Sequence, residues 1–409
     1  IVAEDVESAN TCFANAVALD PKNYWYRYRH AQVNKYISAP AAIEMYEKLI
    51  EDFPKRSDLY WEMVVLYVSE ARYEDALETL NKVETIFGPT EELAVYAYRL
   101  YYTMERVDEG LEYLRNFNAK YSSPQVLTIL ADNEMSMYND TLALKYYSEA
   151  LEIDSTFPAA LSGKAEVYRM LRRYDEFFPA LNRYVECQAA FVEDKTMYLS
   201  AIVEKSDPRF VRRYILQLDS TMHKLAQVHP EDSLVYNLRG QFYYYIGRND
   251  EALEQFQECA LKYPDSYNAT VGYLQFLMYV GKWQELSEES RKAFQKFPNE
   301  PALLETTCLA EYNLANYDKV LEICKEVLQI TPNDSSIVLN AWSTMGDVYY
   351  LSGDSKNAYK AYDNALKIDP ENPYVLNNYA YYLSVEGRDL KKAYQMSRKT
   401  VTADPDNAT

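Results

Sequence analysis

The sequence predicts an all-α protein built from repeated pairs of antiparallel helices. First, only 10 of the 409 residues are glycine, well below the usual ~7%, which leaves little material for hairpin turns and β-bulges. Second, turn-forming residues recur at a fixed step along the chain. Third, a small and then a large residue precede most of these turns at constant distances. A repeated helix pair explains all three observations.

The turn-forming residues are spaced by 34 residues over two long stretches of the chain. The register survives small changes, because Pro332 and Pro370 are 38 apart and Pro370 and Pro405 are 35 apart. Such changes are expected in turns. The residues that keep the 34-residue step are Pro54, Gly88 and Ser122 in the first stretch and Pro230, Pro264, Pro298 and Pro332 in the second.

Two further columns of residues repeat with the turns. A small residue lets two helices approach closely, and a large residue one helical turn later lies on the same face and fills the adjoining space. The stretch 341–354 shows the first helix of such a pair and ends in a Gly-Asp turn. The small residues are Ala9, Ala42, Ala76, Gly110, Ala252, Ala358 and Ala393, and the large ones are Phe13, Tyr46, Leu80, Leu114, Phe256 and Tyr362.

At these residues the chain resembles the tetratricopeptide repeat family. The resemblance implies a right-handed α-solenoid, a superhelix of stacked antiparallel helix pairs, and it covers nearly the whole chain. Five repeats are expected over 22–189, at 22–54, 55–88, 89–122, 123–155 and 156–189. Five more are expected over 231–405, at 231–264, 265–298, 299–332, 333–370 and 371–405.

The remaining segments depart from the repeat pattern. Residues 190–230 have the length of a helix pair but lack the two columns, so we expect a degenerate repeat or an insertion that bends the solenoid. Its helices are predicted near 193–204 and 208–228, with Asp207 as N-cap before Pro208. Residues 1–21 predict only the second helix of a repeat, and 406–409 the start of a further repeat or a tail. We therefore expect the natural protein to continue in both directions, or its ends to dock on another molecule.

The sequence offers no catalytic constellation and no cofactor motif. Nucleophile-elbow, zinc-protease, P-loop and dinucleotide-binding signatures are all missing, and no two of His30, His223 and His229 share a helical face. We therefore expect neither an enzyme nor a bound metal or cofactor. Cys308 and Cys324 fall on facing helices of one repeat. They are interpreted as two packed core residues, with a disulfide in an oxidising compartment as the alternative.

The charge distribution limits the classes of partner. With 42 basic and 62 acidic residues the net charge is −20, which disfavours nucleic acid and anionic lipid. The longest apolar runs, such as 276–280, are too short to span a bilayer. Residues 164–224 differ, with 11 basic against 9 acidic residues, a net of +2. Here a basic patch of Lys205, Arg209, Arg212 and Arg213 predicts an acidic partner or neighbouring acidic repeats, unless these side chains are solvated or paired locally.

The resemblance also implies a binding surface. In this family the first helices of successive repeats line a concave wall that holds peptides or helices of partner proteins. The carboxylate clamp of the chaperone-binding members is absent, because Tyr28 and Gln32, Trp61 and Val65, and Val95 and Arg99 occupy its places. The candidate wall residues are Trp25, Tyr28, Trp61, Arg99, Tyr102, Arg169, Gln241, Tyr244, Gln275, Tyr312, Asp347 and Tyr350, although Tyr102, Tyr244, Tyr312 and Tyr350 also fit simple packing positions.

The sequence thus predicts a non-catalytic scaffold or adaptor for protein or peptide partners. The tyrosine-rich repeats and the linkers 263–265 and 369–372 are similar to exported tetratricopeptide repeat proteins of Gram-negative bacteria. That likeness implies a periplasmic or outer-membrane-associated setting, with membrane association only through a leader or a partner. One alternative is the repeat region of a larger enzyme or signalling protein. Another is a cytoplasmic regulator that binds a short signalling peptide.

Overall fold

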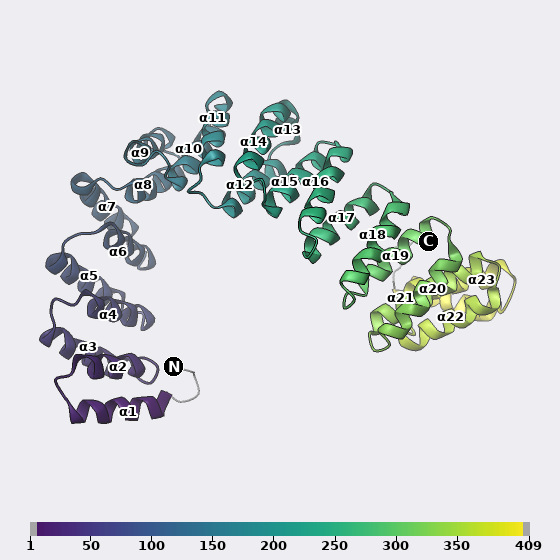
Figure 1. The fold of residues 1–409 in the computed structure, drawn as a ribbon, viewed down its shortest axis with the longest axis horizontal. Helices are drawn as coiled ribbons and strands as arrows, with labels where there is room; N and C mark the ends of the chain where they lie inside the picture. The colour runs from purple at the N-terminus through teal and green to yellow at the C-terminus, as the bar shows by residue number, and fades with distance from the viewer. Residues whose placement is uncertain (1–5, 404–409) are drawn as a thin grey trace. The chain divides into compact units, whose positions relative to one another are not determined.

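The computed structural model describes residues 6–403 and is all-α, as the sequence predicts (Figure 1). These residues form 24 helices, and no strand occurs among them. They divide into two compact units. The first unit runs up to Phe191 and includes Asp219–Val228, and the second contains Val192–Leu218 and the residues from His229 onward.

The first unit contains helices α1 to α11 and most of α14. From α1 to α11 each helix packs against the next along the chain, and α8 also contacts α6 and α10. The helices are α1 (Val6–Leu19), α2 (Tyr24–Asn34), α3 (Ala39–Asp52), α4 (Ser57–Ser69), α5 (Tyr73–Phe87), α6 (Glu91–Thr103), α7 (Val107–Tyr121), α8 (Pro124–Ser136), α9 (Asp140–Ile153), α10 (Pro158–Met170), α11 (Tyr174–Glu186) and α14 (Ile215–Val228).

The second unit contains α12, α13 and the helices from α15 onward. Its first long helix, α12, packs directly against α15, and the helices from α15 to α24 then follow in chain order. They are α12 (Val192–Lys205), α13 (Pro208–Arg213), α15 (Ser233–Tyr245), α16 (Asn249–Lys262), α17 (Tyr267–Tyr279), α18 (Trp283–Lys296), α19 (Ala302–Asn313), α20 (Tyr317–Ile330), α21 (Ser335–Leu351), α22 (Ser355–Ile368), α23 (Pro373–Val385) and α24 (Leu390–Ala403).

The two repeated columns form the seams between helices. Ala42 and Tyr46 are fully buried in the first unit, as are Ala358 and Tyr362 in the second. On the first helix of some pairs, a glycine likewise allows the two helices to pack closely. A Cβ atom added to Gly346 would lie 2.4 Å from the Tyr362 ring. The small residues are therefore required by close helix contact.

In nine of the ten helix pairs, all except α2–α3, the second residue after the first helix is left-handed, and this explains how the chain manages with so few glycines. Five of these nine positions are not glycine, at a cost of about 1 kcal/mol each. The first unit has Ala71, Glu105, Tyr138 and Arg172 at its turns, whereas the second has Gly247, Gly281, Ala315, Gly353 and Gly387.

The irregular region 190–230 differs in part from its prediction. Helix α12 forms as expected, and Asp207 caps α13 by accepting a hydrogen bond from the Arg209 N–H at 2.8 Å. The single helix expected over 208–228 is wrong, because Tyr214, with φ −113° and ψ 24°, leaves the helical region and separates α13 from α14. The compact units also divide this region, since 192–218 belongs to the second and 219–228 to the first.

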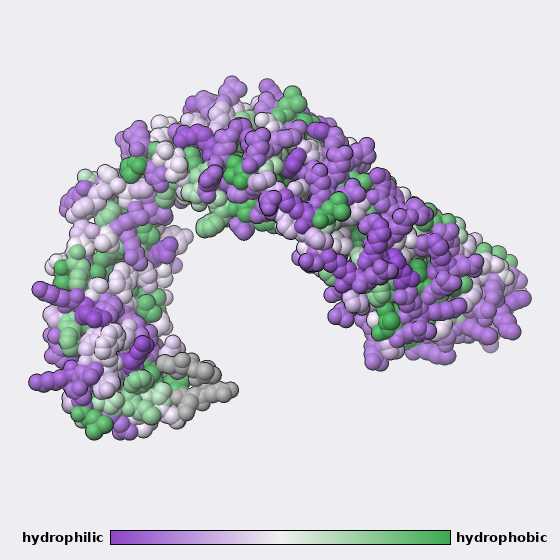
Figure 2. Space-filling view, viewed as in Figure 1, coloured by the Kyte–Doolittle hydropathy of each residue, from purple (hydrophilic) through white to green (hydrophobic). Residues whose placement is uncertain are grey.

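The surface is mainly polar, with hydrophobic side chains scattered over the face shown in Figure 2. No helix within 6–403 is both long enough and apolar enough to cross a membrane. The segment predicted for 406–409 lies outside the described residues.

Candidate functional site

Three candidate wall residues of the second unit, Gln241, Tyr244 and Gln275, line one groove. Its volume is about 780 Å³, and α12, α15 and α17 supply most of its lining. We call it the amide groove. Besides the three predicted residues, the side chains that define it here are Met197, Asn237 and Tyr279, with Gly272 at the α17 wall.

Helical periodicity explains why these side chains meet. Asn237, Gln241 and Tyr244 are spaced by four and three residues, so they share one face of α15. Gln275 follows Gln241 by one 34-residue repeat and occupies the same position on α17. Sequence reasoning missed Asn237, although it lies one helical turn before Gln241. It also missed Met197, for which no repeat pattern was present.

The polar side chains of the amide groove are not used by the fold. Within the described part of the chain, no hydrogen bond engages the side-chain amides of Asn237, Gln241 or Gln275. Aromatic rings stand beside them. Tyr244 packs edge-to-face on Tyr279 with ring centroids 4.7 Å apart, and both side chains are about half exposed. The groove therefore combines free amide groups with a preformed aromatic surface.

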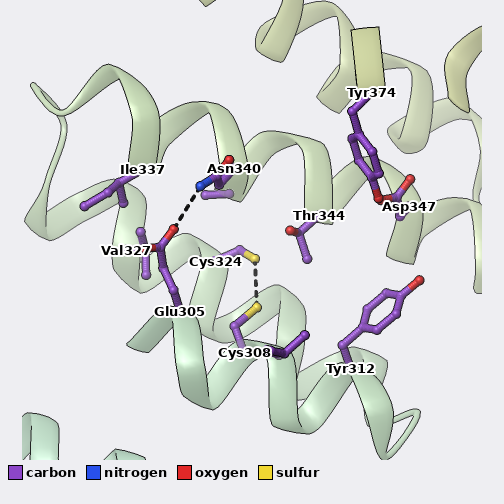
Figure 3. Close-up of a pocket in the computed structure, with 12 residues that line it drawn as sticks. Glu305, Cys308, Tyr312, Cys324, Val327, Ile337, Asn340, Thr344, Asp347 and Tyr374 are labelled. Atoms are coloured by element: carbon purple, nitrogen blue, oxygen red, sulfur yellow. Dashed lines mark hydrogen bonds between the residues drawn. The ribbon is translucent and has the colours of Figure 1, made fainter. Parts of the chain in front are cut away.

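A second cavity in this unit, the acidic cavity, has a volume of about 330 Å³ and contains the candidates Tyr312 and Asp347 (Figure 3). Glu305, Cys308, Cys324 and Tyr374 also line it. The candidate Tyr350 instead stacks on Tyr382, with ring centroids 3.6 Å apart.

Asp347 is the most enclosed polar group of the acidic cavity. Its Oδ1 accepts hydrogen bonds from the Tyr362 hydroxyl at 2.5 Å and the Asn378 amide at 3.0 Å. Its Oδ2 accepts one from the Tyr374 hydroxyl at 2.6 Å. Burial, together with the Asp347 hydrogen bond and charge, raises the pKa of Tyr374 above its ordinary value. Tyr374 therefore remains a protonated donor throughout the physiological range.

Cys308 and Cys324 lie side by side as free thiols. Their Sγ atoms are 3.6 Å apart and both residues are buried. The Cys308 contact, with burial, raises the pKa of the Cys324 thiol. The structure thus shows the packed pair rather than the disulfide that the sequence left as an alternative.

In the first unit the candidate Tyr28 belongs to a hydrogen-bonded network centred on Glu62. The Glu62 carboxylate accepts bonds from the Tyr28 hydroxyl at 3.0 Å, the Gln32 amide at 3.3 Å and the Lys35 ammonium at 2.6 Å. Burial and Glu62 raise the pKa of Tyr28 to about 12. Burial alone would raise the pKa of Glu62, but these bonds and the Lys35 charge lower it below 4.5. The polar groups here satisfy one another.

The other first-unit candidates are spread over several helices. The half-exposed Trp25 packs edge-on against Tyr24, and Trp61 packs edge-on against Tyr96. A further three lie on α6 and α10: Arg99 is exposed, Tyr102 is exposed beside Tyr98, and Arg169 pairs with Glu166 at 2.6 Å.

The four residues of the basic patch are all exposed. Arg209 pairs with Asp207 at 3.0 Å, and the Arg213 guanidinium lies 5.5 Å from the centre of the Tyr214 ring. Lys205 ends α12, and Arg212 lies on α13. An acidic partner for this patch stays a prediction.

The histidines are not brought together. His30 lies on α2, where burial lowers its pKa, and His223 lies on α14 within 3.4 Å of Asp219. His229 Nε2 is 2.9 Å from the Lys195 ammonium. Throughout 6–403, no three His, Cys, Asp or Glu side chains are grouped as metal ligands would be.

Comparison with known proteins identifies the repeats. Family models described as "Tetratricopeptide repeat" match residues 238–266 and 339–372. A TPR repeat-containing protein of Methanocaldococcus jannaschii, MJ1428, is 21% identical over 396 residues, covering 85% of this chain and 70% of the relative.

Two human enzymes are similar over shorter stretches. Protein O-mannosyl-transferase TMTC1 is 26% identical over 157 residues, and aspartyl/asparaginyl beta-hydroxylase is 25% identical over 170. These matches cover 36% and 39% of this chain. They span only 17% and 22% of the two enzymes.

Among solved structures, MamA from Desulfovibrio magneticus RS-1 is 18% identical with a TM-score of 0.36, covering 43% of this chain and 97% of MamA. A chain of the Cut9–Hcn1 complex is 13% identical with a TM-score of 0.30, covering 98% and 91%. The repeated helix pairs agree with the repeat-model matches and with the long similarity to the M. jannaschii protein, and the chain contains tetratricopeptide repeats at 238–266 and 339–372.

Proposed function

We propose that this protein is a non-catalytic interaction scaffold that holds an extended segment of a partner protein in the amide groove. The observation that carries the proposal is the set of unengaged amides of Asn237, Gln241 and Gln275 that line the amide groove. Amide side chains that the fold itself needs are normally hydrogen-bonded within it. Here they are available to a ligand.

The chemistry of the groove fits a peptide main chain. A carboxamide presents a donor and an acceptor together, so it can pair with a backbone C=O and N–H of an extended segment. Tyr244 and Tyr279 supply rigid contact area for an apolar side chain of that segment. Glu193 is the charged residue in the lining. We therefore expect partner segments with little net charge and at least one apolar anchor.

A random peptide library displayed on phage tests this function. Peptides selected on the wild-type protein should bind a Gln241→Ala/Gln275→Ala variant about tenfold more weakly or worse, because two amide contacts are lost. Gln32→Ala in the first unit is the matched control, since Gln32 lies at the same repeat position as Gln241. Equal binding to the double variant would reject the amide groove as the site.

We further propose that the scaffold works in a bacterial cell envelope, in the periplasm or at the outer membrane. The support is the resemblance of its tyrosine-rich repeats and linkers to exported members of the family. Fractionation of the native host with an antibody against this chain tests the setting. Recovery in the cytosolic fraction would contradict it.

The second candidate function is the repeat region of a larger enzyme. It is suggested by the partial similarity to the two human enzymes, each of which is matched over a minor share of its length. The complete reading frame distinguishes the two functions. A catalytic domain in the same frame would support the second candidate.

A further inference from the structure

The acidic cavity of the second unit is elongated along α21, with a carboxylate at each end. At one end Glu305 accepts a hydrogen bond from Asn340 at 3.2 Å, and at the other lies Asp347 (Figure 3). Asn340 and Asp347 are seven residues apart on α21, which corresponds to about 10 Å along the helix axis. Thr344 and the two thiols lie between the ends.

The charge of Asp347 has no cationic partner within residues 6–403. Its hydrogen bonds come from two tyrosine hydroxyls and an asparagine amide, all of which are neutral. Only 4% of the residue is exposed to solvent. Buried charges are normally paired, because an isolated ion loses its hydration without compensation. Burial raises the pKa of Tyr312, and the negative charge of Asp347 raises it further. Both residues line the acidic cavity, so the charge of Asp347 acts on the cavity wall.

Between the two carboxylates the walls are largely apolar. Val327, Ile337 and Ala341 face the cavity beside Cys308 and Cys324, and no lysine or arginine lines it. The volume of about 330 Å³ lies at the small end of the usual range for organic ligands, roughly 300–1,000 Å³. The cavity is therefore suited to a small molecule with an apolar middle and positively charged ends.

We propose that the acidic cavity binds a short aliphatic diamine, with one ammonium group at Glu305 and the other at Asp347. Charge-assisted contacts of about 2.8 Å at each end leave room between the carboxylates for a short methylene chain. That chain lies over Val327, Ala341 and the thiols. This small-molecule site is separate from the amide groove and does not depend on the proposed scaffold function.

Isothermal titration calorimetry with putrescine and cadaverine tests the site directly. The wild-type protein should bind one diamine per chain, and pentylamine, which carries a single ammonium, should bind about tenfold more weakly or worse. Pentylamine binding as tightly as cadaverine would overturn the two-ended site. A wild-type protein that gives no saturable binding of either diamine would overturn the proposal altogether.

Variants assign the two ends. Asp347→Asn and Glu305→Gln each remove one charge with little change in shape, and each should weaken cadaverine about tenfold or more. Glu322→Gln is the matched control, because Glu322 is exposed on α20 and outside the cavity lining. If Asp347→Asn fails to fold, Glu305→Gln alone decides. Cadaverine affinity unchanged in Glu305→Gln contradicts the proposal.

The thiols locate the ligand independently. Saturating cadaverine should slow alkylation of Cys308 and Cys324 by N-ethylmaleimide, as followed by mass spectrometry of peptides. Cys12, which is exposed on α1, and Cys259, which is buried on α16, are internal controls whose rates should not change. Equal slowing at all four cysteines would indicate a general stabilisation and contradict binding in this cavity.

Discussion

The first and second units place polar side chains at the same repeat positions, but these side chains are hydrogen-bonded within the fold in the first unit and unengaged in the second. Tyr28 and Gln32 follow Pro21 by seven and eleven residues, as Asn237 and Gln241 follow Pro230. In the first unit the next repeat supplies Glu62, which binds both side chains. In the second unit the equivalent position, eight residues after the repeat's proline, is Gly272.

This difference shows that one residue in the following repeat decides whether a wall is closed or open. A Cβ atom added at Gly272 would meet nothing nearer than 3.8 Å, so the groove wall there accepts a side chain in ordinary van der Waals contact. Glu62 fills the corresponding place with a carboxylate and recruits Lys35 as its counter-ion. The position of a residue within its repeat places its side chain on the wall. The residue opposite it in the next repeat determines whether that side chain is free to bind a ligand.

The largest effect is expected at a glycine that, like Gly272, lies on the first helix of a pair but is crowded by a neighbouring side chain. Gly346→Ala should destabilise the second unit by up to about 3 kcal/mol, because the new methyl overlaps the buried Tyr362 ring. Urea unfolding monitored by circular dichroism measures the loss. Gly272→Ala is the control and should be stabilising by about 0.5–1 kcal/mol, as alanine favours a helix interior. Equal changes in unfolding free energy for the two variants would contradict the conclusion that Gly346 is crowded and Gly272 is not.

Removing the charge of Glu62 breaks the first-unit network. Glu62→Gln should cost about 1.5–2 kcal/mol at neutral pH, since a charged hydrogen-bond acceptor is lost. The folded-state pKa of Glu62 lies below the ordinary value of 4.5. Its stabilisation is therefore present above pH 4.5 and is lost as the pH falls through the folded-state pKa.

Urea unfolding of wild-type and Glu62→Gln proteins between neutral and acidic pH tests this dependence. The difference in unfolding free energy should shrink below pH 4.5, because the glutamine does not titrate. Glu92→Gln, an exposed change on α6, controls for the loss of one surface charge. A difference that is independent of pH would show that the Glu62 charge is not what stabilises the network.

Introducing the first-unit carboxylate into the second unit should close the amide groove. In Gly272→Glu the new side chain starts 4.0 Å from the Asn237 Oδ1 atom and within reach of the groove amides. We expect binding of selected peptides to weaken about tenfold, or roughly 1.4 kcal/mol. Fluorescence anisotropy with a labelled peptide measures this, and Gly272→Ala should bind normally. Unchanged peptide affinity in Gly272→Glu would show that the selected peptides do not bind in the amide groove.

The smallest effect concerns the turns, where the units also differ. Ala71→Gly should stabilise the first unit by about 1 kcal/mol, because glycine adopts the left-handed conformation without the Cβ penalty. The converse change in the second unit, Gly281→Ala, should be destabilising by a similar amount. Melting temperatures of the two variants should therefore shift in opposite directions, and shifts of the same sign would contradict the turn assignment.

Sequence reasoning predicted the helix pairs well because proline spacing and the small and large columns are local signals. It placed Gln241, Tyr244 and Gln275 on a common wall by the same register. It failed at Tyr214, where no proline or glycine marks the end of α13. It also could not separate Tyr28 from the groove residues, because the Glu62 contact depends on side-chain packing across two repeats.

Asp347 joins three helices through one carboxylate, since it lies on α21 and accepts bonds from Tyr362 on α22 and from Tyr374 and Asn378 on α23. In a linear array of repeats, cooperativity of unfolding depends on the energy of each junction between neighbours. A junction secured by a buried carboxylate is costly to open, because opening would leave its tyrosine donors unmatched. The amide hydrogens of α21, α22 and α23 should therefore exchange with solvent as a single kinetic block.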